Sequence, residues 1–345
     1  MLKQIKNHSI LTSIILAIVV ISLVVSTPTA YATLSSDTIK KHQQQPLLSI
    51  ISTRDTPIFD LAHMTKLVND TITKFDENKT CPSDIAIYIH DFNKSKDDAG
   101  EEFNRIQTSL NISKSSIPFL IGFSWESKVP WEQAKVNANN SGGELAKFIL
   151  ALKYKCQTTN IHLVAHSLGA AVVGSTLSYL DIYLNDRISN NNTKIIKSVH
   201  LLGAAINNLS IIKGTPLGKA IENLVDKFYN LYNPQDDGLQ FNKFFERHNP
   251  LGLVGAPKGT ISQNYNDINV IDEIPALSDA DGDGNLEECF EENGLALVKG
   301  DNHCGYIGFR QPFSNSLINN GAMDVVVSDW KNQTLNKGND IVQQP

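Results

Sequence analysis

Short apolar runs alternate with longer amphipathic segments along most of this chain, beginning near Cys81. The short runs have the length and composition of buried strands, and the longer segments carry apolar positions at helical spacing. This alternation is typical of a parallel sheet with helices on both faces. The sequence therefore predicts an α/β fold with a mostly parallel central sheet. The expected strands are 85–89, 119–123, 161–165, 195–202, 228–232 and 295–298, and the expected helices are 99–110, 131–152, 170–184, 217–227 and 322–332.

The N-terminal segment has the pattern of a secretory signal. Lys3 and Lys6 precede a largely apolar run over residues 10–25, and Ala30 and Ala32 form an A-x-A cleavage motif. We therefore expect a signal peptide over residues 1–32 and a secreted or cell-surface protein, with an uncleaved signal anchor as the alternative. Residues 33–55 are polar and Gln-rich, which predicts a flexible lead into one domain at 56–345.

Composition narrows the classes of function. The 345 residues suffice for one large α/β domain, and the formal net charge of −6 shows no basic excess. We therefore expect no nucleic-acid partner. Nothing in the sequence implies a partner protein or a cofactor for catalysis.

One segment carries the main chemical signal. Residues 161–175 read I-H-L-V-A-H-S-L-G-A-A-V-V-G-S, a strand that turns sharply at Ser167 into a helix of small residues. This is the layout of a nucleophile elbow, although Ala165 stands where the G-x-S-x-G pattern has its first glycine. Gly169 and Ala170 are small enough for this turn to close and for substrate to reach the Ser167 Oγ atom. The N–H of Leu168 is a candidate oxyanion donor. The alternative is a serine that merely ends a buried strand.

These motifs resemble the α/β-hydrolase superfamily, in particular its lipase-like and esterase-like branch with an H-G-F loop and an H-S-L-G elbow. The resemblance covers roughly residues 80–335. It is carried, in order, by I-Y-I-H-D-F-N at 87–93, G-F-S-W-E-S at 122–127, H-L-V-A-H-S-L-G-A at 162–170, Y-N-P-Q-D-D-G-L at 232–239 and G-D-N-H-C-G-Y at 300–306.

The resemblance implies a catalytic acid and base after Ser167, in that order. His303 is the expected base, because His200 lies inside an apparent strand and His248 follows the acid too closely. The turn after strand 228–232 supplies the acid. Asp236 is favoured there because D-x-x-L fits its register, and Asp237 is the alternative. A turn aspartate that bonds only its own backbone is the non-catalytic reading.

The expected second oxyanion donor is the backbone N–H of Phe92. Here the loop reads H-D-F, so Asp91 replaces the glycine of the resembling families. A carboxylate beside an oxyanion opposes it unless the carboxylate is turned away or neutralised. This departure predicts altered substrate choice, a different donor or reduced activity.

The four cysteines suit an exported protein. In the fold that the resemblance implies, strands 85–89 and 161–165 are neighbours, so Cys81 and Cys156 lie at the same edge of the sheet and form a plausible disulfide. Cys289 is then left to pair with Cys304.

An acidic loop lies in an expected insertion at about residues 239–293. Residues 279–288 read D-A-D-G-D-G-N-L-E-E and resemble an EF-hand calcium loop, although Phe290 stands at its twelfth position. We expect a structural Ca²⁺ site there, with a solvated acidic loop as the alternative. The expected ligands are Asp279, Asp281, Asp283, Asn285 and Glu287.

Together these features predict an extracellular serine hydrolase that cleaves carboxylic esters of small molecules or lipids through an acyl-enzyme on Ser167. Two alternatives remain. One is an exported binding protein that keeps the hydrolase scaffold without activity, and the other is a triad hydrolase that acts on amides or thioesters.

Overall fold

The computed structural model describes residues 47–54, 61–76, 80–117, 119–185, 194–274, 291–292, 295–296, 301–310 and 317–340. The chain divides into two compact units, Met1–His42 and Gln43–Pro345. All described residues belong to the second unit. The predicted signal segment and the expected ligands of the calcium loop lie outside the described residues.

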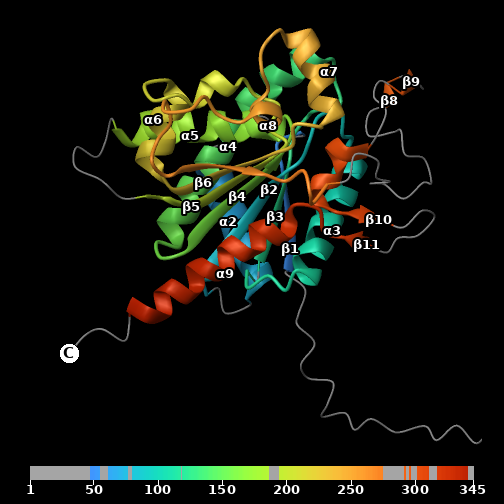
Figure 1. Ribbon diagram of the computed structural model, residues 1–345. Coiled ribbons are helices and arrows are strands. Elements are labelled where there is room, and N and C mark those ends of the chain that lie inside the picture. Colours follow the sequence, from blue (N-terminus) through green and yellow to red (C-terminus); the bar gives the residue numbers. More distant parts are fainter. Residues whose placement is uncertain are drawn as a thin grey trace, which may run out of the picture. The chain divides into compact units, whose positions relative to one another are not determined.

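A seven-stranded sheet forms the centre of this unit (Figure 1). Its strands run in the order β1-β3-β2-β4-β5-β6-β7, and every neighbouring pair is parallel. The predicted α/β class with a mostly parallel central sheet is thus confirmed. The strands are β1 (Leu47–Ser52), β2 (Asp84–Ile89), β3 (Phe119–Ser124), β4 (Asn160–His166), β5 (Ile196–Leu202), β6 (Val225–Tyr232) and β7 (Tyr265–Asn269).

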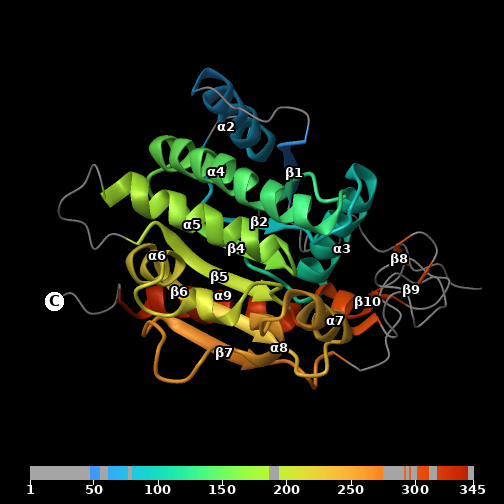
Figure 2. The ribbon, with the colours of Figure 1, turned by 90° about the horizontal axis from the view of Figure 1, so that it is seen from above.

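Helices cover both faces of the sheet, as Figure 2 shows from above. Alternate side chains of β2 explain why: Ile85, Ile87 and Ile89 enter one apolar core, while Ala86 and Tyr88 enter the other. The first core includes residues of α2 (Leu61–Phe75), α4 (Trp131–Lys155), α5 (Gly169–Asn185) and α6 (Pro216–Leu224). The second includes residues of α3 (Lys96–Ile112) and α9 (Met323–Asp340).

Shorter elements follow the strands that end near the candidate site. They are η2 (Asn208–Ile211), α7 (Asp237–Glu246), α8 (Leu251–Val254), β8 (Glu291–Glu292), β9 (Leu295–Ala296), η3 (Asp301–Ile307), β10 (Phe309–Arg310) and β11 (Leu317–Asn319). Two of them correct the sequence analysis. Residues 295–296 pair with β8 in a separate antiparallel ribbon and are no part of the main sheet. The predicted helix at 217–227 ends at Leu224, because β6 begins at Val225.

Strand β1 lies inside the segment that the sequence analysis expected to be flexible. It pairs with β3 along its whole length at one edge of the sheet, with Ile51 buried and Ile50 about half exposed (48%). Its sequence, LLSIIS, is mostly apolar, but it directly follows the polar, Gln-rich stretch with which the sequence analysis groups it. The core therefore begins before residue 56.

The structure joins Cys81 and Cys156 in a disulfide, as predicted, with their Cα atoms 5.6 Å apart. The bond links the segments that lead into β2 and β4, which pair along their length. The predicted bond between Cys289 and Cys304 involves Cys289, which lies outside the described residues.

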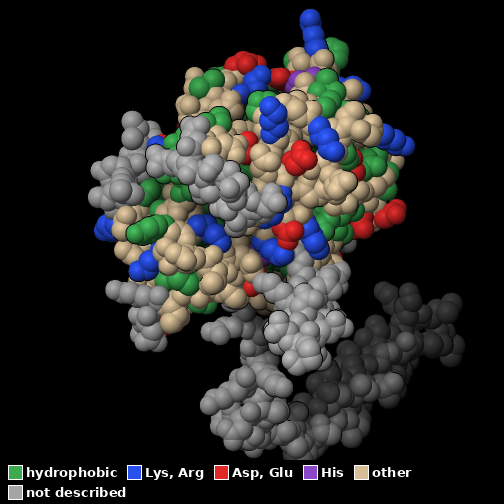
Figure 3. Space-filling view, turned by 90° about the vertical axis from the view of Figure 1, so that its left-hand side faces the viewer, with side chains coloured by type: hydrophobic (Ala, Val, Ile, Leu, Met, Phe, Trp, Pro, Cys, Tyr) green, Lys and Arg blue, Asp and Glu red, His purple; other side chains and the backbone are tan. Residues whose placement is uncertain are grey.

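Charges of both signs are interspersed on the face shown in Figure 3, and hydrophobic side chains are scattered among them. Among the described residues, no helix is both long and apolar enough to cross a membrane.

Candidate active site

The strand β4 turns into α5 through a strained elbow at Ser167. Ser167 has a φ of 51°, in the left-handed region that residues other than glycine rarely adopt. Its N–H donates to the carbonyl of Leu202 on the neighbouring strand (2.9 Å). A Cβ at Gly169 would lie 2.7 Å from the backbone oxygen of Ile89, so only glycine fits there. The turn therefore has the geometry of a nucleophile elbow, in which strain is typical of functional positions.

Ser167, His303 and Asp236 form one hydrogen-bonded chain. The Nε2 atom of His303 lies 2.8 Å from Ser167 Oγ, and its Nδ1 atom lies 2.9 and 2.8 Å from the two carboxylate oxygens of Asp236. Because the carboxylate only accepts, Nδ1 carries the proton and Nε2 presents its lone pair to the serine. All three side chains are buried, with Ser167 3% exposed.

Asp236 is held by more than the histidine. It caps the N-terminus of α7 by accepting the N–H of Leu239 (2.8 Å), and it accepts the hydroxyl of Tyr306 (3.2 Å). Asp237, the alternative acid, is only partly buried, and its N–H donates to Asn302. The structure thus pairs Asp236, and not Asp237, with His303.

The short helix η3 carries His303 into place. Asn302 is fully buried and donates from its side chain to the carbonyl of Gln235 (2.5 Å). Its side-chain oxygen accepts the N–H of Asp237, so Asn302 links η3 to the turn that holds Asp236. Asn302 and Tyr306 are not among the predicted site residues, although both lie within three residues of His303.

The Asp236 carboxylate raises the pKa of His303. Burial by itself disfavours the imidazolium, but the adjacent carboxylate outweighs it and raises the pKa of His303 above 6.5. A raised pKa makes the imidazole a stronger base toward the serine proton.

The two expected oxyanion donors differ. No hydrogen bond within the described residues uses the N–H of Leu168, which therefore stays available to a ligand. The N–H of Phe92 instead donates to the carboxylate of Asp91. Asp91 is fully buried, and although burial opposes its ionisation, the charged and hydrogen-bonding groups around it hold its pKa below the ordinary value. The Asp91 carboxylate, whose negative charge was expected to oppose an oxyanion, is thus bound to the N–H of Phe92, the expected oxyanion donor.

Aromatic contacts fix the loop that carries Asp91 and Phe92. The ring of His90 stacks on Trp125 (centroids 5.5 Å apart), and its Nε2 atom accepts the backbone N–H of Trp125 (3.1 Å). Burial lowers the pKa of His90 to about 4, which keeps this ring neutral. The Phe92 ring packs edge-on against Trp131 of α4, with centroids 5.0 Å apart. The loop is therefore held on both sides of Asp91.

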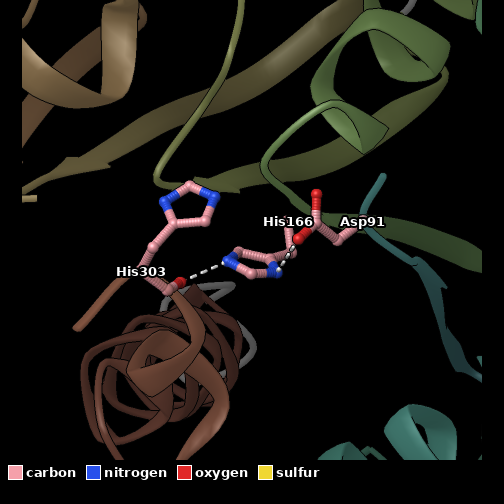
Figure 4. Close-up of side chains that lie close together, drawn as sticks. All are labelled: Asp91, His166 and His303. Carbon is pink, nitrogen blue, oxygen red and sulfur yellow. Dashed lines mark hydrogen bonds and ion pairs between the residues drawn. The ribbon is translucent and has the colours of Figure 1, made fainter. Parts of the chain in front are cut away.

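His166 is a site residue that the sequence analysis missed. It ends β4 and lies between the Asp91 carboxylate, 3.8 Å from its Nδ1, and the backbone oxygen of His303, 2.7 Å from its Nε2 (Figure 4). The other two histidines weighed as bases lie elsewhere. His200 is buried against Asp329, and His248 lies beside Glu246.

A cavity of about 570 Å³ borders the first turns of α5. Ala170, Ala171, Ile206 and Leu217 give it an apolar part, and Ser175 and Asn207 add polar groups. Its volume lies within the usual range of small-molecule sites.

The parallel sheet, the elbow, and the order of Ser167, Asp236 and His303 along the chain are those of an α/β hydrolase. Residues 65–244, which are 180 of the 345 residues, match the family described as alpha/beta hydrolases of unknown function (DUF900), and the chain belongs to this family. The matched region contains Ser167 and Asp236 but ends before His303. A comparison with curated proteins finds no match.

Proposed function

We propose that this α/β hydrolase is a serine hydrolase that cleaves carboxylic esters through an acyl-enzyme on Ser167. The observation that carries the proposal is the unbroken hydrogen-bonded chain from Ser167 through His303 to Asp236. A serine is a weak nucleophile unless a neighbouring base takes its proton, and this arrangement supplies that base in the required tautomer.

In the first step, Ser167 Oγ attacks the ester carbonyl while His303 Nε2 takes the serine proton. The imidazolium, which Asp236 stabilises, then gives this proton to the leaving alcohol as the carbon–oxygen bond breaks. In the second step, water attacks the acyl-enzyme and passes its proton to His303. The acid product leaves, and the proton returns to Ser167.

The developing oxyanion would lie against the N–H of Leu168. The N–H of Phe92 can also bind the oxyanion only when Asp91 releases that N–H, so Asp91 lowers the rate. Each such donor is worth about 10²–10³ in kcat.

The cavity beside α5 is our candidate for one side of the ester. Its lining reaches Ala170, three residues from Ser167, and mixes apolar and polar groups. These features suit a small or medium-sized acyl or alcohol group.

We further propose that the protein is exported and that the acidic loop at 279–287 binds a structural Ca²⁺. The signal pattern at residues 1–32 and the disulfide between Cys81 and Cys156 support export. The spacing of the carboxylates supports calcium. A fall in melting temperature on EGTA treatment, restored by Ca²⁺ and absent in Asp281→Asn, tests the calcium site.

The direct test is hydrolysis of p-nitrophenyl esters of graded chain length by wild type and Ser167→Ala. We expect turnover by wild type, with a chain-length optimum set by the pocket. Loss of Ser167 should lower kcat by about 10⁴- to 10⁶-fold. Equal rates in the two proteins, with the fold intact by circular dichroism, contradict the proposal. Matched amide and thioester substrates distinguish an esterase from a hydrolase that acts on amides or thioesters.

The non-catalytic binding protein is the second candidate. The observation that favours it is the Asp91 carboxylate on the Phe92 N–H, because this charge opposes an oxyanion. A protein that binds but does not hydrolyse any ester class, with Ser167 unreactive toward a fluorophosphonate, fits this candidate.

A further inference from the structure

We propose that Asp91, His166 and His303 form a site for one divalent transition-metal cation with the ligand preferences of Zn²⁺, and that its occupancy inhibits the hydrolase. The inhibition rests on the proposed function, whereas the binding does not. One donor atom from each residue lies within 4.8 Å of the other two, and all three residues are buried.

His166 presents a lone pair to this site. Its Nε2 lies 2.7 Å from the carbonyl oxygen of His303, and a carbonyl only accepts, so Nε2 carries the ring proton. The Nδ1 atom of the neutral ring is therefore a bare acceptor. It is buried and has no hydrogen bond within the described residues.

Asp91 faces that lone pair with a second acceptor. Its Oδ2 atom lies 3.8 Å from His166 Nδ1, is buried, and likewise makes no hydrogen bond to any described residue. Two electron-rich atoms that face each other in a dry interior repel unless a positive group lies between them. The arrangement thus calls for a cation or a proton at this point.

His303 supplies the third donor. Its Nδ1–H is bound to Asp236, which leaves the Nε2 lone pair on the side of Ser167. Histidines that bind metals almost always donate their other ring N–H to a carboxylate or a backbone carbonyl. His303 does the first and His166 does the second, so both rings are already oriented as metal ligands.

The donor set and the spacing fit zinc better than calcium or magnesium. Two imidazoles and one carboxylate form a ligand set of catalytic zinc sites, with bonds of about 2.0–2.2 Å. Ligand atoms of a tetrahedral site with such bonds lie about 3.3 Å apart. The distance of 3.8 Å between Asp91 Oδ2 and His166 Nδ1 is close to this value. The other two separations are at most 4.8 Å, so they must shorten by up to about 1.5 Å for all three donors to bind one ion.

Occupancy would block the proposed reaction in a specific way. A metal bound to His303 Nε2 occupies the lone pair that must take the proton of Ser167. The serine then keeps its proton and loses its nucleophilicity. The metal would also hold Asp91 near the oxyanion position, which gives this carboxylate a role at the place where the resembling families have glycine.

Calorimetric titration of the Ser167→Ala protein with ZnCl₂ tests the binding without any enzymatic readout. We expect one ion per chain and a rise in melting temperature with zinc concentration. Loss of a hydrogen-bond partner of a metal ligand weakens metal binding by about 10- to 100-fold. Asp91→Asn and His166→Gln change the ligands themselves, so each should weaken zinc binding by more than this. Melting curves without metal establish that each variant is folded.

His248→Gln is the matched control, because His248 and Glu246 form a histidine–carboxylate pair 3.6 Å apart without a third ligand among the described residues. It should bind zinc as the parent protein does. Equal affinity of the parent and the folded Asp91→Asn protein, or no saturable binding, overturns the metal site and leaves a shared proton between Asp91 and His166.

Inhibition is measured separately with wild type and p-nitrophenyl esters. We expect zinc to abolish turnover with the constant found by calorimetry, and 1,10-phenanthroline to restore it. Zinc that binds without changing the rate overturns the inhibitory role. If wild type hydrolyses no ester, the proposed function fails, while calorimetry still decides the metal site.

Discussion

The two sides of the candidate active site differ in how their buried polar atoms are satisfied. On the side of the acid and base, Asp236 accepts from His303, Leu239 and Tyr306. On the oxyanion side, one oxygen of Asp91 and one nitrogen of His166 are buried without a hydrogen bond within the described residues. Buried polar groups are normally paired, so the first side needs nothing further, whereas the second is built for a ligand or a shared proton.

Removal of the Asp236 carboxylate should disrupt the hydrogen-bonded side of the site, which holds Asp236 and His303. Asp236→Asn replaces an acceptor with an amide and disturbs the tautomer of His303, so kcat should fall by about 10⁴-fold. Ester hydrolysis measures the loss. The control is Asp237→Asn, which changes the neighbouring carboxylate that does not contact His303 and should leave kcat within a fewfold. A larger loss in the control would reassign the acid.

Removal of the Asp91 carboxylate should raise kcat, whereas removal of the Asp236 carboxylate lowers it. Asp91→Gly frees the N–H of Phe92 for the oxyanion and removes a negative charge, so kcat for a neutral ester should rise by up to about 10²-fold. Asp91→Asn loses the charge but keeps a side chain on that N–H, so its gain should be smaller. A fall in kcat for the folded Asp91→Gly protein would show that the carboxylate assists the reaction.

The pH dependence should report the charge on the satisfied side. His303 must be neutral to accept the proton, and its pKa is raised above 6.5. At pH values below this pKa, kcat/KM should therefore fall about tenfold per pH unit. Asp236→Asn removes the carboxylate that raises this pKa and should move the limb to lower pH. The profile is measured with a chelator present. A limb below pH 6 in wild type would contradict the assignment of His303 as base.

The disulfide should affect stability more than chemistry. Cys81 and Cys156 are 75 residues apart, and the chain-entropy argument assigns such a loop about 4 kcal/mol. Cys81→Ser with Cys156→Ser should lower the free energy of unfolding by about this amount. Activity at 25 °C should remain near that of wild type, because the bond precedes β2 and β4 while the site follows them. Denaturant titration and ester assays check the two expectations.

Local patterns explain what the sequence could predict. The elbow at Ser167 and the strands β2 to β6 rest on short runs of apolar and small residues, and the structure has them near the expected bounds. The pairing of His303 with Asp236 was expected from motif order. The strand predicted before His303 is not in the main sheet. The prediction of His303 therefore depended on the order of the motifs and not on the local apolar pattern.

Tertiary contacts explain what the sequence could not show. The strands β1 and β7 lie at the two edges of the sheet, where burial is incomplete. The strand β7 is mostly polar, and the apolar run of β1 directly follows a polar, Gln-rich stretch. His166 gains its role from the carbonyl of His303, which is 137 residues away. Tyr306 reaches Asp236 across 70 residues. No periodicity or spacing encodes such contacts.

Reaction of the purified protein with a fluorophosphonate, followed by mass spectrometry of its peptides, tests the activated serine most directly. The account predicts stoichiometric modification of Ser167, loss of labelling in Ser167→Ala, and a strongly reduced rate in Asp236→Asn. Modification at another serine, or no modification of the folded, chelator-treated wild type, would contradict the claim that Ser167 is the nucleophile.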